Sequence, residues 1–193
     1  MLDEQTSVLV NVTQTLERLE VPYFIAGSFA SNVHGFYRAT ADADLVADLK
    51  LRHIEPFAEA LHGEFYLAVE AIRDAVMRRA SFNVIHLDTA QKVDVFLLKR
   101  EFYPLSEMER RCRKRLAPEA AEQAWFASAE DTILAKLDWY RRGGGVSDRQ
   151  WGDVTGVLKV QAPTLDRDYL RHWAGELALT HLLNRALEES GLA

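Results

Sequence analysis

Cysteine is almost absent from this chain of 193 residues, which has a single thiol at Cys112. One thiol cannot form an intramolecular disulfide, which fits a reducing compartment. No apolar run approaches the roughly 20 residues that a membrane-spanning helix needs. The opening Met1–Glu4 lacks the basic segment and the apolar stretch of a signal peptide. We therefore expect a cytoplasmic protein with no membrane segment.

Positive charge is also scarce, because 23 Lys and Arg residues face 29 Asp and Glu residues, and the formal net charge is -6. A protein whose main activity is to coat nucleic acid needs a large positive surface, so that class is disfavoured. The six histidines show no spacing of the H-x-x-x-H kind, which argues against a zinc site. One basic run is a candidate RNA-docking segment, although such a run on a helix is more often a solvated face. It consists of Arg110, Arg111, Arg113, Lys114 and Arg115.

Hydrophobic residues make up 48% of the chain, enough to fill the core of one domain or of a core domain with a helical appendage. Strand-like runs alternate with helical periodicity as far as about residue 127, and helical periodicity alone follows. We therefore predict an α/β (α+β) fold with a mixed β-sheet core flanked by helices over residues 1–127. A helical C-terminal region, residues 128–193, is predicted to pack on that core.

The hydrophobic pattern also predicts individual elements. An amphipathic helix is expected from Val8 to Leu19, followed by a strand from Val21 to Ile25. Later helices are expected at 29–34, 53–62, 71–79, from about 129, after the capping Ser147, and once or twice within 169–187. Later strands are expected around Asp42 and Asp44, at 64–69, and as a hairpin of 82–87 with 93–98.

Two aspartates two positions apart form the most informative motif. Side chains of a strand alternate between its faces, so Asp42 and Asp44 would project together while Ala43 faces the core. Two carboxylates on one face repel unless a cation joins them, and oxygen ligands of this kind suit Mg²⁺. A third acid, Asp94, lies within the apolar run Val93–Leu98 and needs a salt bridge, a hydrogen-bond network or a metal.

A small-residue turn lies upstream of these acids. Gly27 and Ser28 follow a strand-like run, where bare backbone can meet a phosphate and the Ser28 hydroxyl can donate to it. A Gly-Ser turn alone is weak evidence for that role, and its distance from the Asp-x-Asp motif is what favours it. The guanidinium group of Arg38 can donate several hydrogen bonds to a phosphate. Pairing of Arg38 with a surface acid is an equal alternative. Thr40 is expected to brace the strand.

Together these residues resemble the DNA polymerase β-type nucleotidyltransferase superfamily, whose pattern is Gly-Ser, then Asp-x-Asp, then a strand with one acid. More narrowly, the chain is similar to small bacterial nucleotidyltransferases related to the AbiE-type toxins of type IV toxin–antitoxin systems. The segments Glu130–Leu137 and Asp148–Val154 resemble that family's E-D-x-x-x-x-K-L and R-x-x-D segments in the same order. One departure is Ala43, where a larger aliphatic residue is usual, and it should alter packing more than chemistry.

The resemblance implies a mechanism in which an acceptor hydroxyl attacks the α-phosphate of a nucleoside triphosphate. Two Mg²⁺ ions, with Mn²⁺ as the alternative, would be held by Asp42, Asp44 and Asp94. The implied nucleotide- and phosphate-binding residues are Gly27, Ser28, Arg38 and Lys136, supported by Thr40 and Asp153. Plain structural roles are open for several of them: an ordinary acidic strand edge, a Lys136 that reaches solvent, and an Asp131 that caps a helix.

We therefore predict a Mg²⁺-dependent, toxin-like nucleotidyltransferase that moves a nucleoside monophosphate from a nucleoside triphosphate to a hydroxyl of RNA or protein, with a small antitoxin as a candidate partner. An aminoglycoside-type small-molecule nucleotidyltransferase is the alternative, because the basic run favours RNA only weakly. A non-catalytic nucleotide-binding or antitoxin-type module is the rival from another class. The presence of all three acids counts against that rival.

Overall fold

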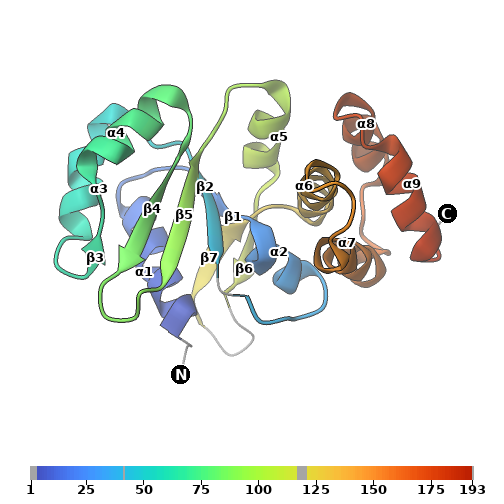
Figure 1. Cartoon of the computed structure of the whole chain (residues 1–193), viewed down its shortest axis with the longest axis horizontal. Helices are drawn as coiled ribbons and strands as arrows, with labels where there is room; N and C mark the ends of the chain where they lie inside the picture. Colours follow the sequence, from blue (N-terminus) through green and yellow to red (C-terminus); the bar gives the residue numbers. More distant parts are fainter. Residues whose placement is uncertain (1–3, 41, 117–120, 193) are drawn as a thin grey trace. The chain divides into compact units, whose positions relative to one another are not determined.

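A computed structural model of the chain describes residues 4–40, 42–116 and 121–192 (Figure 1). These residues form two compact units. The sheet unit consists of the described residues of Met1–Ala26 and Thr40–Phe126, and the helical unit consists of those of Gly27–Ala39 and Ala127–Ala193. The sequence division at residue 127 places residues 27–39 with the sheet, whereas in the structure they group with the C-terminal helices.

The sheet unit is built on a seven-stranded sheet with the order β3-β4-β5-β2-β1-β7-β6. Its strands are β1 (Tyr23–Ile25), β2 (Ala43–Ala47), β3 (Phe65–Tyr66), β4 (Ser81–His86), β5 (Lys92–Leu97), β6 (Cys112–Arg115) and β7 (Gln123–Phe126). Its helices are α1 (Glu4–Arg18), the short 3₁₀ helix η1 (Leu51–His53), α3 (Ile54–Ala60), α4 (Val69–Arg78) and α5 (Phe102–Arg110). The sheet is mixed, as predicted, because β2 runs parallel to β5 but antiparallel to β1.

One face of the central strands is buried and the other is half-exposed. On β2, Leu45 is fully buried while Asp44 is not, and β5 alternates in the same way between Val95 and Asp94. The buried face lies under α3, whose Phe57 ring meets Phe82 of β4 edge-on at 6.1 Å. Full burial of one such apolar side chain contributes about 1.5–3 kcal/mol. The hydrophobic face therefore fixes which side chains stay on the polar face, since a slip of one residue would exchange them.

The structure corrects the predicted elements at several positions. β2 begins at Ala43, so Asp42 lies just before the strand rather than on it. β3 is limited to Phe65–Tyr66 because α4 already begins at Val69. The sequence pattern does not predict α5, β6 or β7 at all. β6 reads Cys-Arg-Lys-Arg without hydrophobic alternation, and only its antiparallel pairing with β7 makes it a strand.

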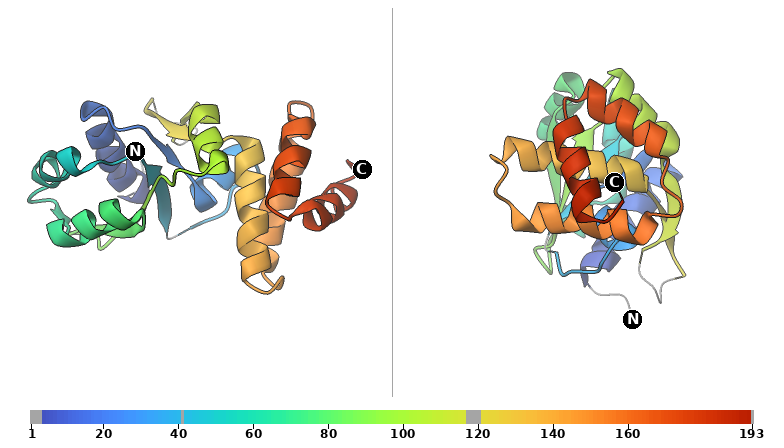
Figure 2. Two further views of the ribbon diagram at one scale, coloured as in Figure 1. Left: turned by 90° about the horizontal axis from the view of Figure 1, so that it is seen from above. Right: turned by 90° about the vertical axis from the view of Figure 1, so that its right-hand side faces the viewer.

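The helical unit contains α2 (Gly27–His34), α6 (Ala129–Arg142), α7 (Asp148–Gln161), α8 (Arg167–Glu176) and α9 (Thr180–Glu189). Figure 2 shows α6 and α7 side by side. They are joined through the predicted break, where Gly144 and Gly145 adopt positive φ angles of 80° and 73°. Ser147 caps α7 as predicted, because its side chain accepts a hydrogen bond from the Gln150 amide. None of the described helices combines the length and apolarity that crossing a bilayer requires.

The helix α2 belongs to this unit because it packs against both α6 and α7. The backbone at Gly35, just after α2, lies close to that of α7. A Cβ atom there would lie 2.9 Å from the backbone nitrogen of Val157 and 3.0 Å from the carbonyl oxygen of Ser31. Both neighbours are backbone atoms that cannot rotate away. The absence of a side chain at residue 35 therefore permits the packing of α2 on α7.

We expect Gly35→Ala to destabilise the protein by about 1–3 kcal/mol, the usual cost of overpacking. Urea unfolding of the full chain, followed by circular dichroism, measures the change. Gly175→Ala is the matched control, because a Cβ at that exposed position in α8 meets nothing within 4 Å. Equal stability of the two variants would contradict the close contact at Gly35.

Candidate functional site

Two of the predicted acids are neighbours in the sheet unit. Asp44 of β2 and Asp94 of β5 are register partners on adjacent parallel strands, so their side chains leave the same face. Asp42 precedes β2 by one residue and is exposed. Thr40 donates a hydrogen bond from its hydroxyl to the Asp42 carbonyl oxygen at 3.3 Å, just before β2. We call Asp42, Asp44 and Asp94 the acidic row.

A lysine that the sequence reasoning did not single out accompanies the acidic row. The ammonium of Lys92 lies 2.7 Å from Oδ2 of Asp94. Its hydrogen bond to Asp94, and the charges of Asp94, Asp42 and Asp44, raise the pKa of Lys92 above 10.5 despite partial desolvation. Strand periodicity could have revealed this residue, because Lys92 lies two positions before Asp94 and therefore on the same face.

The acidic row offers donors of the kind that a divalent cation prefers. Its donors are all carboxylate oxygens, which hard divalent cations prefer, and strand register places two of them side by side. Within the described part of the chain, no three His, Cys, Asp or Glu side chains are already gathered around one point. Asp94 is instead engaged by Lys92. Both the carboxylate chemistry and the register of Asp44 with Asp94 fit a divalent cation. Lys92 is paired with Asp94.

The turn residues begin the helix α2 in the helical unit. Gly27 has a φ of 59°, in the left-handed region that glycine tolerates best, which explains why a glycine suits this position. The next residue, Ser28, presents its hydroxyl to two cations: Nη2 of Arg38 donates to it at 2.7 Å and the ammonium of Lys136 at 3.3 Å. The predicted phosphate-binding residues Ser28, Arg38 and Lys136 are therefore in contact.

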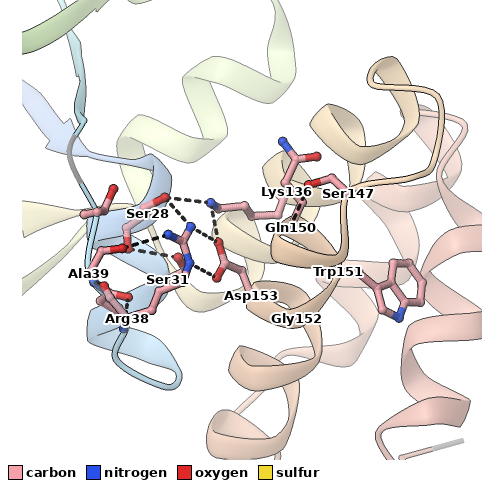
Figure 3. Close-up of polar contacts among 12 residues, drawn as sticks. Ser28, Ser31, Arg38, Ala39, Lys136, Ser147, Gln150, Trp151, Gly152 and Asp153 are labelled. Atoms are coloured by element: carbon pink, nitrogen blue, oxygen red, sulfur yellow. Dashed lines mark hydrogen bonds and ion pairs between the residues drawn. The ribbon is translucent and has the colours of Figure 1, made fainter.

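Asp153 joins the two cations (Figure 3). Arg38 makes a bidentate contact with Asp153, in which Nε donates to Oδ1 at 2.7 Å and Nη2 donates to Oδ2 at 2.8 Å. The ammonium of Lys136 lies 2.7 Å from Oδ2. Asp153 is 8% exposed. Arg38 therefore pairs with a buried acid and not with the surface acid that was considered from the sequence. We call Ser28, Arg38, Lys136 and Asp153 the cation cluster.

The cation cluster carries an excess of positive charge, because two cations share one carboxylate. Burial alone would raise the pKa of Asp153, but hydrogen bonds and charges from Arg38 and Lys136 outweigh it and lower that pKa below 3.8. The pKa of Arg38 is raised by its hydrogen bond to Asp153. Asp153 and Arg38 are therefore both charged at neutral pH. An anion such as a phosphate would balance the remaining positive charge.

The backbone of the Arg38 loop is held in place by Asn32, another residue that the sequence reasoning missed. The Asn32 side chain donates to the Arg38 carbonyl oxygen at 2.7 Å and accepts from the Arg38 amide at 3.1 Å. These two hydrogen bonds hold the backbone of Arg38, which lies outside any helix or strand. No sequence signal identifies Asn32, because the contact depends on how the loop folds back.

The Glu130-Asp131 segment has a structural role. Ser128 caps α6 by accepting from the Asp131 amide at 3.0 Å, and its hydroxyl donates to the Asp131 carboxylate at 2.6 Å. Asp131 also accepts from the Tyr169 hydroxyl at 2.8 Å, and Glu130 accepts from the Asp166 amide at 2.8 Å. The N-cap of α6 is therefore Ser128 and not Asp131, and the two acids tie α6 to the start of α8.

Trp151 and the basic run have structural roles. Trp151 points away from the cation cluster (Figure 3) and donates to Glu189 at 2.6 Å, which joins α7 to α9. The basic run lies at the end of α5 and on β6, and not on a helix alone. It occupies one edge of the sheet, where charged side chains discourage pairing with other chains.

The sequence matches no protein-family model and no curated protein. Solved structures resemble it more clearly. A solution structure of the antibiotic-resistance factor ANT(2'')-Ia aligns with a TM-score of 0.57 at 14% identity, covering 96% of this chain and 100% of that one. A nucleotidyltransferase-like protein from Paracoccidioides brasiliensis gives 0.57 at 17%, covering 96% and 93%. ANT(2")-Ia in complex with adenylyl-2"-tobramycin gives 0.54 at 13%, covering 90% and 97%. The predicted fold class is confirmed as nucleotidyltransferase-like.

We expect Asp153→Asn to destabilise the protein by about 3 kcal/mol at pH 7, because the buried Lys136 and the half-buried Arg38 lose their carboxylate. Since the folded-state pKa of Asp153 is lowered, its contribution is present above the ordinary pKa of 3.8 and is lost as the pH falls through the folded-state value. Urea unfolding at pH 7, 5 and 3 should therefore show wild type and variant converging only in acid.

The matched control for this experiment is Asp168→Asn on the surface of α8, where the carboxylate is almost fully exposed and lies 3.7 Å from Arg171. Surface pairs contribute little, so this variant should stay close to wild type throughout. A stability gap for Asp153→Asn that persists unchanged to pH 3 would show that charge is not the cause.

Proposed function

We propose that the protein is a Mg²⁺-dependent nucleotidyltransferase that transfers a nucleoside monophosphate from a nucleoside triphosphate to a hydroxyl group. The observation that carries the proposal is the register of Asp44 with Asp94 on a nucleotidyltransferase-like sheet, with Asp42 two residues before Asp44. Ordinary strand packing does not require two neighbouring carboxylates on one face. A cation between them removes their repulsion.

In this proposal the acidic row holds the metal. Asp42 and Asp44 would hold two Mg²⁺ ions, or Mn²⁺ in their place, and Asp94 would hold the ion nearer the acceptor. When bound, such an ion pair stabilises the attacking and leaving oxygens of an in-line displacement. The chain contributes the spacing of the carboxylates, which the ladder between β2 and β5 fixes.

The cation cluster would bind the triphosphate. Arg38 presents a planar fork, Lys136 a point charge, and Ser28 a hydroxyl at the start of α2, whose N-terminal amides favour an anion. Asp153 has a positioning role in this proposal, because it holds both cations without neutralising them completely. Gly27 allows the backbone to turn into α2.

The reaction is a displacement at the α-phosphorus. The acceptor oxygen forms a bond to the α-phosphorus, the bond to the bridging α–β oxygen breaks, and pyrophosphate leaves with that electron pair. The hydroxyl proton passes to water or to a neighbouring carboxylate. The charge on pyrophosphate is the feature that Arg38 and Lys136 suit, because two fixed cations stabilise a leaving anion more than they stabilise neutral groups.

The acceptor divides the proposal into two branches. RNA or a protein hydroxyl is the leading branch, and it includes the toxin-like reading with a small antitoxin partner in the cytoplasm. The likeness to ANT(2")-Ia, whose complex contains adenylyl-2"-tobramycin, favours an aminoglycoside-type small molecule as the second branch. Both branches use the same acidic row and cation cluster, so the first test concerns the nucleotide alone.

We expect one nucleoside triphosphate with Mg²⁺ to raise the melting temperature, since a ligand at 100 times its Kd adds about 2.7 kcal/mol of stability. Thermal unfolding with each of the four triphosphates, with and without Mg²⁺, measures this. Asp44→Asn should abolish the Mg²⁺-dependent part. Asp74→Asn, which removes an exposed acid of α4, is the matched control and should respond as wild type does. A full response in Asp44→Asn would overturn the metal assignment.

We expect labelled nucleotide to appear in only one class of acceptor when the wild-type protein is incubated with total RNA, with a protein mixture or with an aminoglycoside. Arg38→Ala should lower the rate by at least about tenfold through weaker triphosphate binding, because a charged hydrogen bond contributes about 1.5–3 kcal/mol. Separation on denaturing gels and thin-layer plates identifies the labelled class. A binding response without transfer to any class would favour the non-catalytic module.

A further inference from the structure

We propose that Lys92 is an internal counter-cation of the acidic row: in the metal-free protein its ammonium stands in for a divalent ion at Asp94, and metal binding displaces it. This inference rests on the proposed function, because it concerns the same three carboxylates. It assigns a role to a residue that belongs neither to the acidic row nor to the cation cluster.

The position of Lys92 supports this role directly. Its ammonium is 2.7 Å from Oδ2 of Asp94, the distance of a charge-assisted hydrogen bond. Asp44 and Asp94 are register partners, and Lys92 lies on the same face of β5 as Asp94. The charges of Asp42 and Asp44 also act on Lys92. One ammonium therefore lies within the field of all three carboxylates.

The exposure of the pair makes displacement physically reasonable. The Lys92 side chain is 37% exposed and that of Asp94 is 19% exposed. The ammonium can therefore leave Asp94 for water without first being buried, and an ion can reach Asp94 from solvent. A flexible four-carbon stem allows that movement without any change in the strand. A fully buried ion pair would not exchange in this way, because separating it leaves an unpaired buried charge.

The electrostatic consequence is a competition between Lys92 and the metal. Without Lys92, Asp44 and Asp94 on one face would repel each other and the metal-free protein would lose stability. With Lys92, an incoming divalent ion must break the contact with Asp94 and then experience repulsion from a nearby positive charge. Lys92 therefore stabilises the metal-free protein and weakens the affinity of the nucleotide-free protein for the metal.

Mn²⁺ binding to the full-length, nucleotide-free protein tests the inference, with the unbound ion measured by electron paramagnetic resonance. We expect Lys92→Met to lower the Kd for Mn²⁺ by roughly tenfold, as expected when one nearby unit charge is removed from a partly solvated site. Lys92→Arg keeps the charge and should not tighten binding. Lys114→Met is the matched control, because it removes the charge of an exposed lysine on β6, which is separated from β5 by three strands of the sheet.

Thermal unfolding in EDTA and in Mn²⁺ supplies a second readout. Lys92→Met should melt below wild type in EDTA and recover more than wild type when Mn²⁺ is added. If Lys92→Met folds poorly, Lys92→Gln removes the same charge with a polar side chain. Unchanged or weaker Mn²⁺ binding in the folded neutral variant would overturn the inference.

Asp44→Asn separates this failure from a failure of the proposed function. If Asp44→Asn loses Mn²⁺ binding and Lys92→Met binds no more tightly than wild type, the metal assignment stands and the inference on Lys92 falls. If Asp44→Asn binds Mn²⁺ as well as wild type does, the metal assignment is wrong, and the inference fails with it.

Discussion

The carboxylate of Asp153 accepts hydrogen bonds from Arg38 and Lys136 at once, and the arrangement of the helical unit depends on that sharing. Arg38 comes from the loop after α2, Lys136 from α6 and Asp153 from α7, so one buried acid joins three segments. The apolar packing of α2 on α6 and α7 brings these segments close, but hydrophobic contacts are not directional. The directional contacts come from Asp153, whose one carboxylate is shared by two cations.

The sheet unit uses the opposite balance of charge. There the charges of three carboxylates act on one ammonium, whereas in the cation cluster two cations share one carboxylate. A metal–triphosphate complex contains both kinds of charge, a cation and a polyanion. The proposed function follows from this complementarity in each unit considered by itself. Charged groups whose pKa values are shifted by specific partners, as those of Lys92 and Asp153 are, are typical of functional sites.

The sequence predicts those parts of the molecule that depend on short-range periodicity. The helix α1 and the hairpin of β4 and β5 are confirmed, because their apolar residues recur at the spacing of a helix or a strand. The register of Asp44 with Asp94 could not be predicted, since it requires two strands distant in sequence to pair in parallel. The contact of Arg38 with Asp153 joins residues 115 positions apart. Local patterns identify such residues as candidates, and only the tertiary structure brings them together.

The helical unit is discontinuous in the chain, and this discontinuity affects its synthesis on the ribosome. The helix α2 emerges early, but α6 and α7, against which it packs, follow only after the long segment Thr40–Phe126 has been made. At about 5–20 residues per second, that interval lasts on the order of several seconds. During this time α2 has no packing partners within its own unit, and a helix of 8 residues is marginal in isolation. The Arg38 loop can take its final form only late in translation, after the chain has reached Asp153.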